Sequence, residues 1–473
     1  MSDDKTYGCT RRSFLHGAGL TLAGFGVGSL LPGPWIRHAL ASGPFSNRRL
    51  LFIFLRGGND GINAVIPGGD PDYNTTNRPT LYIPPASSIN LNGFARLHPS
   101  LGDLTEIFNA GDLAVAHRVG FPNNSRSHFD DQRVWENGDP AQPKSFEGWL
   151  YRYIQENAVA AGFNLPALSV QANQPVLMRG DEPFVNIANP NTFDYLYTDP
   201  KKSKLAAGWD GQYTNLTGLE PYRPLLSQTS VKLIDTLDEY RSWDQLNWDP
   251  KDPNTPANSL FPVSDATNPP DPGGPNGLKF AATSYSFFRA LKVCALSFLE
   301  SDAVNQNGTR LAGTELNGFD THTAQGDEAG TQAQLLSWLA YGMRSLRIVL
   351  SGAAIDPRAY PPVWNDTVVV TLSEFGRTTK ENGSLGSDHA AASCLFAAGG
   401  TINGGVYNCD PSTWPAGVML ADAGRYLLMR TDYRAIFWEI LRDHMGAAGS
   451  SVDTIFPGYT VQGLGAQELG IVA

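Results

Sequence analysis

Leu-Leu-Phe-Ile-Phe-Leu at residues 50–55 runs directly into Arg-Gly-Gly-Asn-Asp-Gly at residues 56–61. Six consecutive apolar residues indicate a strand that is buried on both faces, and the glycines after it indicate a tight turn at its carboxyl end. Strands of this kind belong to sheets that are covered by helices on both sides. This segment therefore predicts an α/β protein.

The rest of the chain alternates strand and helix patterns in the same way. Apolar runs predict further strands at residues 113–119 and 367–372, and amphipathic or capped segments predict helices at 101–110, 127–137, 331–351 and 432–445, the last with Thr431 as its N-cap. This alternation predicts a mainly parallel sheet with helices on both faces. Residues 249–277 are rich in Pro, Asn, Asp and Gly and predict a surface loop, and residues 140–280 are expected to form a cap or insertion.

Composition and charge limit the class of protein. The chain has 473 residues, of which 41% are hydrophobic and 17% charged, so it can bury a sizeable core. Its formal net charge is −11, and residues 1–41 are net basic, which makes the remaining body more acidic still. Such a body repels phosphodiester backbones, and we expect no nucleic-acid partner.

The N-terminal segment has the pattern of an export signal. Arg11 and Arg12 precede an uncharged, glycine-rich stretch at residues 17–34, and Ala39-Leu40-Ala41 follows. Paired arginines, a weakly apolar middle and an Ala-x-Ala end predict a cleavable twin-arginine signal over residues 1–41, with the export machinery as its partner. The expected location is periplasmic or secreted, with no stable membrane span after cleavage; retention as an uncleaved anchor is the alternative.

Three cysteines follow the proposed cleavage site, an odd number that permits at most one disulfide: Cys294, Cys394 and Cys409. We take Cys394–Cys409 as the candidate pair.

Acids and imidazoles lie where strands or loops would present them to one crevice. Asp60 follows the first strand, and Glu374 follows the strand at 367–372. Asp320 and His322 are two residues apart and would share one side of an extended segment, and His389 supplies another imidazole. This mixture of oxygen and nitrogen ligands predicts a divalent metal site, with Zn, Mn, Mg and Ca all open. The alternatives are a turn at Asp60, an ion pair of Glu374 and ordinary loop histidines.

A nucleophile candidate lies at the start of the helix predicted over 127–137. Ser127 follows a strand and a short loop, and a helix N-terminus stabilises negative charge. The alternative is a variant capping box in which Ser127 caps the helix with Asp130. Arg126 and Arg377 are candidates for clamping an anion, with structural ion pairs as the alternative.

Some motifs are absent from the sequence that follows the signal. It contains no Gly-x-Ser-x-Gly elbow, no Walker loop and no His-Glu-x-x-His helix. Three other histidines lie outside these candidate groups and are expected to be structural: His98, His117 and His444.

Five motifs carry a resemblance to a known bacterial family: Leu-Arg-Gly-Gly-Asn-Asp-Gly (55–61), Ser-Arg-Ser-His-Phe (125–129), Gly-Phe-Asp-Thr-His (318–322), Ser-Glu-Phe-Gly-Arg (373–377) and Asp-His (388–389). Over about residues 48–446 the chain resembles the domain of unknown function 1501 family, which belongs with alkaline-phosphatase-like and sulfatase-like proteins. The resemblance implies a doubly wound α/β core and a one- or two-metal hydrolase site.

The resemblance also implies roles for single residues. Asp60 and Glu374 would bind one metal, and the ligands of a second metal would be Asp320, His322 and His389. Ser127 would be the nucleophile beside Arg126, and Arg377 and His128 would contact substrate. Two departures matter. Glu374-Phe375 stands where the hydrolases have Asp-His, so one imidazole is missing unless His128 or His389 replaces it, and the Cys/Ser-x-Pro-x-Arg motif of sulfatases is absent.

The expected function is an exported, metal-dependent hydrolase of phosphate or sulfate esters, acting on a polysaccharide or another anionic envelope component. The rival is a secreted, non-catalytic binding or assembly protein with a degraded metal site, which Phe375 favours. A transferase or mutase acting on phosphorylated carbohydrate is the third class.

Overall fold

The computed structural model describes residues 47–157, 165–180, 184–193, 240, 243–264, 282–303 and 309–473. The predicted export signal and residues 265–277 of the predicted loop lie outside these ranges. No helix within them is both long and apolar enough to cross a membrane.

The predicted central strand is β1 (Arg49–Arg56), and it lies between two parallel neighbours, β8 (Leu311–Asn317) and β9 (Thr367–Leu372). The described part of the main sheet has the order β13-β5-β12-β9-β1-β8-β6-β7, and β14 pairs with β5. β12 is antiparallel to both of its neighbours, whereas the other pairings are parallel. The remaining bounds are β5 (Leu113–Gly120), β6 (Ala167–Ser169), β7 (Val185–Asn186), β12 (Ser393–Gly399), β13 (Gly405–Tyr407) and β14 (Thr431–Asp432).

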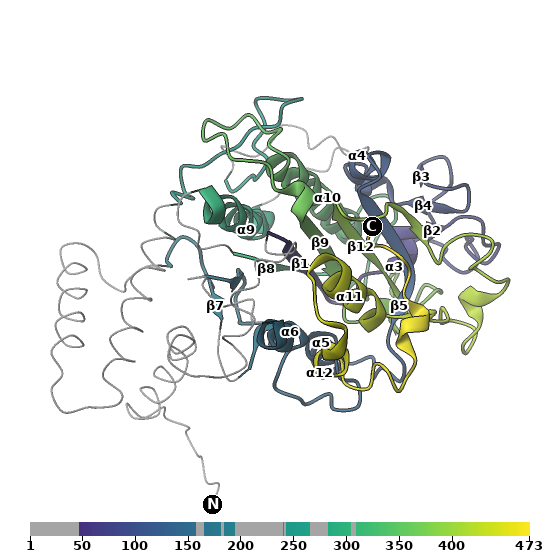
Figure 1. The fold of residues 1–473 in the computed structure, drawn as a ribbon. Coiled ribbons are helices and arrows are strands. Elements are labelled where there is room, and N and C mark those ends of the chain that lie inside the picture. Colours follow the sequence, from purple (N-terminus) through teal and green to yellow (C-terminus); the bar gives the residue numbers. More distant parts are fainter. Residues whose placement is uncertain are drawn as a thin grey trace, which may run out of the picture.

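Helices cover both faces of this sheet, as Figure 1 shows. Alternate side chains of β1 enter two different cores, with Leu51 and Ile53 on one face and Phe52 and Phe54 on the other. The first core is closed by α4 (Leu104–Asn109), α9 (Tyr285–Ala303) and α10 (Thr331–Leu350). The second is closed by α5 (His128–Asn137), α6 (Trp149–Asn157), α11 (Tyr433–Glu439) and α12 (Val452–Ile455). The α/β class and the mostly parallel sheet are confirmed.

A smaller apolar cluster lies beside the main sheet. It joins the short helix α3 (Gly61–Ala64) to a three-stranded antiparallel sheet of β2 (Val65–Pro67), β4 (Ala95–Leu97) and β3 (Ile89–Asn90). This unit follows directly from the turn after β1. The segment that directly follows Asp60 is therefore buried.

Several sequence expectations require correction. The final helix begins one residue later than expected, because Asp432, and not Thr431, caps it by accepting from the backbone N–H of Arg434. The helix expected over 101–110 is divided between a 3-10 turn (Pro99–Leu101) and α4. The candidate disulfide Cys394–Cys409 is wrong, because both thiols are free and buried. The cap or insertion over residues 140–280 stays a prediction; among the described residues of that range, β6 and β7 extend the main sheet and α6 packs in its second core.

The three histidines expected to be structural are buried. Each bonds to a backbone carbonyl, as His444 does to Arg49 at 2.9 Å, and burial lowers the pKa of His444 to about 4. Burial likewise lowers the pKa of His98 to about 4 and that of His117 to about 3. These imidazoles are therefore neutral parts of the core.

Acid should destabilise the fold through these histidines. The pKa of His444 is lower in the folded chain than its ordinary value of 6.5, so its contribution to stability is complete above about pH 6.5 and is lost as the pH falls towards 4. We expect His444→Gln to flatten the fall of unfolding free energy between about pH 7 and about pH 4.5, by up to about 3 kcal/mol. Urea unfolding at several pH values measures this, and equal slopes in both proteins would contradict it.

Candidate metal centre

The centre forms where β1, β8 and β9 end, because parallel neighbours present their carboxyl ends at one edge of the sheet. Gly57 follows β1 with a φ of +116°, and a Cβ there would lie 2.4 Å from the backbone nitrogen of Asp320. A Cβ on Gly58 would lie 2.4 Å from the ring of Phe375. The two glycines are therefore required for the three loops to approach one another.

Arg377 holds these loops together from within. Its side chain is fully buried, and it donates to the carbonyls of Gly58 at 2.7 Å and Ser387 at 2.9 Å, and to that of Gly57. It also donates to the carbonyl of Phe319 at 3.0 Å and to Oδ1 of Asp320 at 2.7 Å. Because this guanidinium faces carbonyls and not solvent, the described structure gives it the role of positioning Asp320 instead of the anion clamp expected above.

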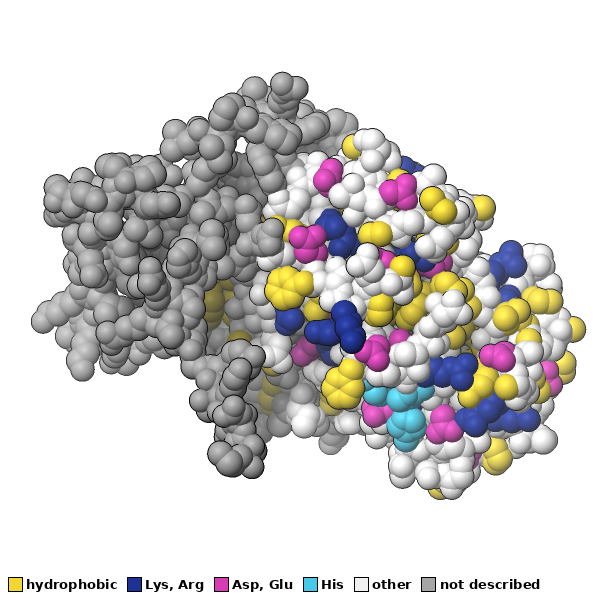
Figure 2. Space-filling model, turned by 90° about the horizontal axis from the view of Figure 1, so that it is seen from below, with side chains coloured by type: hydrophobic (Ala, Val, Ile, Leu, Met, Phe, Trp, Pro, Cys, Tyr) yellow, Lys and Arg dark blue, Asp and Glu magenta, His cyan; other side chains and the backbone are white. Residues whose placement is uncertain are grey.

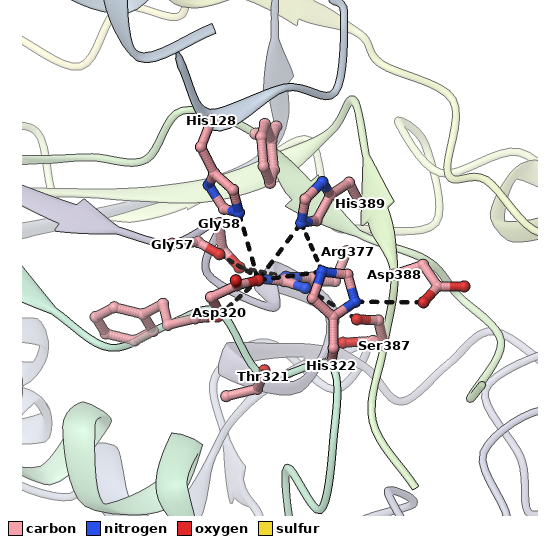
Figure 3. Close-up of polar contacts among 12 residues, drawn as sticks. Gly57, Gly58, His128, Asp320, Thr321, His322, Arg377, Ser387, Asp388 and His389 are labelled. Atoms are coloured by element: carbon pink, nitrogen blue, oxygen red, sulfur yellow. Dashed lines mark hydrogen bonds and ion pairs between the residues drawn. The ribbon is translucent and has the colours of Figure 1, made fainter. Parts of the chain in front are cut away.

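Three imidazoles surround the same carboxylate oxygen, as Figure 3 shows. The distance from Asp320 Oδ1 to Nε2 is 3.4 Å for His128, 3.2 Å for His322 and 3.4 Å for His389. The ligand atoms of His128, Asp320 and His389 all lie within 4.8 Å of one another. Nε2 of His322 also lies 2.8 Å from Nε2 of His389.

The other nitrogen of each ring contacts an oxygen. Nδ1 of His128 lies 2.8 Å from Oε1 of Glu374, and Nδ1 of His389 lies 2.8 Å from the carbonyl oxygen of Arg126. Nδ1 of His322 lies 3.4 Å from Oδ1 of Asp388. A carbonyl and ionised carboxylates only accept, so Nδ1 of each ring carries a proton. The hydrogen bond between the Nε2 atoms of His322 and His389 then needs a second proton on one of these two rings.

Without a proton on any Nε2 atom, four electron-rich atoms face one another. Partial burial opposes ionisation of Asp320, but the hydrogen bond from Arg377 and the charge of Arg377 lower its pKa to about 2. Nε2 of His128 is buried and has no hydrogen-bond partner among the described residues. Ligand atoms on a tetrahedral Zn²⁺ are about 3.3 Å apart, given bonds of about 2.0–2.1 Å. The distances of 3.2–3.4 Å from Asp320 Oδ1 match this spacing.

The centre is open to solvent on one side. Half of the Asp320 side chain is exposed, as is 41% of that of His322. Figure 2 shows histidine side chains at the surface of this face, with acidic and basic side chains beside them. A solute can therefore reach the imidazoles without passing through the core.

Phe375, which stands where an imidazole was expected, is buried beneath the centre. Its ring centroid lies 4.8 Å from that of His128 and 4.4 Å from that of His389. The ring thus supports two imidazoles that the sequence alone did not bring together.

Glu374 is fully buried and contacts a ligand candidate through one oxygen. Its Oε1 accepts from Gln132 at 3.0 Å and from the backbone of Gly57 at 2.8 Å, in addition to its contact with His128. Burial by itself would raise its pKa, but these hydrogen bonds keep the pKa below its ordinary value. Oε2 has no hydrogen-bond partner among the described residues. Glu374 therefore orients His128 in this structure.

Asp60 lies apart from the group around Asp320. It pairs with Arg78 at 2.7 Å, accepts from Gln325 at 2.7 Å and caps α3 through the backbone of Ile62. Burial opposes its ionisation, yet the charge of Arg78 leaves its pKa lowered. Its link to the centre is indirect, because Gln325 also accepts from Ser387, the residue before Asp388.

The loop before α5 is held by Asp131 and not by Ser127. The carboxylate of Asp131 accepts from the backbone of Ser125 at 2.9 Å and from that of Arg126 at 2.8 Å. The hydroxyl of Ser127 makes no capping bond, so the capping-box alternative is wrong. Within the described contacts, this hydroxyl touches none of the residues around Asp320. The guanidinium of Arg126 lies over Tyr426, with 3.9 Å from its carbon to the ring centroid.

Replacing Arg377 tests whether it holds the centre. Arg377→Lys keeps the charge but loses the planar fork, so we expect unfolding free energy to fall by about 2–4 kcal/mol and zinc affinity to fall at least about tenfold. Arg434→Lys is the matched control, because Arg434 is also fully buried and pairs with Asp432. Arg434→Lys should lower the unfolding free energy and leave zinc affinity unchanged. Urea unfolding and zinc titration measure both effects, and unchanged zinc affinity in Arg377→Lys would contradict the expected role.

Comparison with known proteins adds one finding. No curated protein and no solved structure matches the chain. Residues 297–413, about a quarter of the chain, match the family model described as "Protein of unknown function (DUF1501)". The matched segment contains Asp320, His322, Arg377 and His389, so the chain is similar to this family over most of the residues that build the centre.

Proposed function

We propose that this chain is a metal-dependent hydrolase of phosphate or sulfate esters with a one-metal centre at His128, Asp320 and His389, beside which His322 offers a further imidazole. The observation that supports it most is the orientation of the imidazoles. Each Nδ1 contacts an oxygen outside the centre, and each Nε2 faces the ionised oxygen of Asp320. Histidines that bind metals are held in this way by outer acceptors.

The donor set favours zinc or manganese among the divalent ions. Imidazole nitrogens suit Zn²⁺ and other transition metals, whereas Mg²⁺ and Ca²⁺ prefer sites made of oxygen. A proton bound among these atoms is the alternative to a metal ion, because the contact of His128 with Glu374 raises the pKa of His128. Asp320 already accepts from Arg377, and a single proton can join only two of the three Nε2 atoms, so a cation with several coordination positions fits the imidazoles better.

The surroundings favour one metal over two. The acid expected to bind the other metal, Asp60, is neutralised by Arg78. Glu374, its expected companion, contacts His128 instead. These two carboxylates therefore pair with other side chains of the protein. The oxygen and nitrogen atoms that remain available to a metal are those around Asp320.

The chemistry proposed is ester hydrolysis. A bound divalent ion polarises an ester oxygen and lowers the pKa of water. Ser127 is the nucleophile in this proposal, since it lies one residue before His128 at the start of α5, where the helix dipole stabilises negative charge. Arg377 and Phe375 contribute by fixing Asp320 and the imidazoles.

Export is part of the proposal. The paired arginines and the Ala-x-Ala end of residues 1–41 support a periplasmic or secreted location. A polysaccharide or another envelope component that carries esterified phosphate or sulfate would then be the accessible substrate. The same signal is compatible with the rival, a secreted binding protein. The pairing of Asp320 with Arg377 favours this rival, because Arg377 already neutralises the carboxylate of Asp320.

Metal binding is the first test. We expect the metal-free protein to take up one zinc ion per chain, and His389→Ala to weaken zinc binding by at least about tenfold because one ligand is lost. His444→Gln serves as the control, since His444 is buried outside the centre. Isothermal titration calorimetry measures both, and equal affinities in the two variants would contradict the assigned site.

Catalysis is tested separately with Ser127→Ala. We expect turnover of aryl phosphates or aryl sulfates by the zinc-loaded protein to fall at least about 100-fold, with zinc affinity unchanged. Unchanged turnover would remove Ser127 as the nucleophile. Zinc binding without any turnover in the original protein would favour the binding-protein rival.

A further inference from the structure

We propose that Arg126, Arg425 and Tyr426 form an anion subsite beside the metal centre, and that it holds a second anionic group of the substrate. This inference rests on the proposed function and narrows its substrate class to esters that carry at least two phosphate or sulfate groups. Arg377, the partner expected from the sequence, is replaced in this role by Arg425.

The two guanidinium groups share one aromatic ring. The guanidinium carbon of Arg126 lies 3.9 Å from the ring centroid of Tyr426, and that of Arg425 lies 5.4 Å from the same centroid. The ring attracts each cation and holds both guanidinium groups beside it. An anion bound by both arginines would gain charge-assisted hydrogen bonds.

Each arginine is connected to an imidazole of the centre. The carbonyl oxygen of Arg126 lies 2.8 Å from Nδ1 of His389. Arg425 donates to Oδ2 of Asp388 at 2.5 Å, and the other oxygen of that carboxylate lies 3.4 Å from Nδ1 of His322. The subsite therefore adjoins the metal centre through its own hydrogen bonds.

Both guanidinium groups retain binding capacity. The side chains of Arg126 and Arg425 are 36% and 38% exposed. Arg126 pairs with Asp422 only at 3.7 Å, and Asp422 is itself 58% exposed, so this surface pair contributes little. Nε of Arg425 is buried without a hydrogen-bond partner among the described residues.

The backbone of Arg126 supports a functional role for its placement. Its φ is +59°, in the left-handed region that an arginine seldom adopts, at a cost of about 1–2 kcal/mol. Asp131 fixes this conformation by accepting from the Arg126 backbone at 2.8 Å. Strained backbone of this kind occurs preferentially at functional sites, where the surrounding structure enforces it. Here it turns the carbonyl to His389 and the side chain to Tyr426.

The chemistry of the ligand follows from the two adjoining sites. One anionic group would meet the metal, and a second would meet the two arginines. An oligophosphate carries such groups directly linked, and a carbohydrate with two sulfate or phosphate groups carries them on a sugar. Both classes of ligand therefore carry two neighbouring anionic groups.

The experiment compares ligands with one and two anionic groups on the zinc-loaded protein. Calorimetry with inorganic phosphate, pyrophosphate, tripolyphosphate and a glucose disulfate should show at least about tenfold tighter binding of one two-anion or longer ligand than of phosphate. Arg126→Asn, whose asparagine tolerates the left-handed backbone, and Tyr426→Leu should each reduce this difference to less than about threefold. Zinc affinity should stay unchanged in both variants.

Arg442→Asn is the matched control, because the Arg442 side chain is also 36% exposed and pairs with Asp443. It should retain the full preference. Zinc binding without any preference for ligands with two anions would overturn the subsite and leave the proposed centre standing. A preference that persists in Arg126→Asn and Tyr426→Leu would do the same. Failure to bind zinc would instead contradict the proposed function and this inference with it. The ligand that binds most tightly distinguishes directly linked anions from anions on a sugar.

Discussion

A buried guanidinium determines how this molecule is organised around its candidate site. Arg377 has no access to water, so its N–H groups must find acceptors within the protein, and they find them at the backbone carbonyls of Gly57, Gly58 and Phe319 and at Asp320. Leaving such a charge unpaired costs about 3–5 kcal/mol. The loops that follow β1 and β8 are therefore tied to the loop after β9, and Asp320 is fixed as the counter-charge among the imidazoles.

The sequence predicted three strands of the main sheet, β1, β5 and β9, together with the long helix α10. It did not reveal β8, although β8 is the parallel neighbour of β1. In β8, Gly313 faces the ring of Phe52, where a Cβ would lie 2.0 Å from Cζ, and Glu315 pairs with Arg56. Tertiary contacts require both Gly313 and Glu315. Because of these two residues, the sequence of β8 resembles that of a polar, glycine-containing loop.

The site was anticipated unevenly for a related reason. Residue type and spacing suggested Asp320, His322 and His389, and the structure places them together around one oxygen. Residue type cannot distinguish a carboxylate that would bind a metal from one that orients a ligand or neutralises an arginine. Glu374 belongs to the second kind and Asp60 to the third, because their partners, His128 and Arg78, are known only once the chain is folded.

Charge balance explains why such a centre would select anions although the whole chain is acidic. Arg377 neutralises Asp320, and Arg425 neutralises Asp388. A divalent ion would then bring two positive charges beside the buried carboxylate of Glu374, since the imidazoles remain neutral when they bind a metal. The formal charge of −11 repels polyanions, but salt largely screens that repulsion beyond about 10 Å. With such an ion bound, a local excess of positive charge would favour a small, multiply charged ester over a long nucleic acid that must also lie against the acidic body.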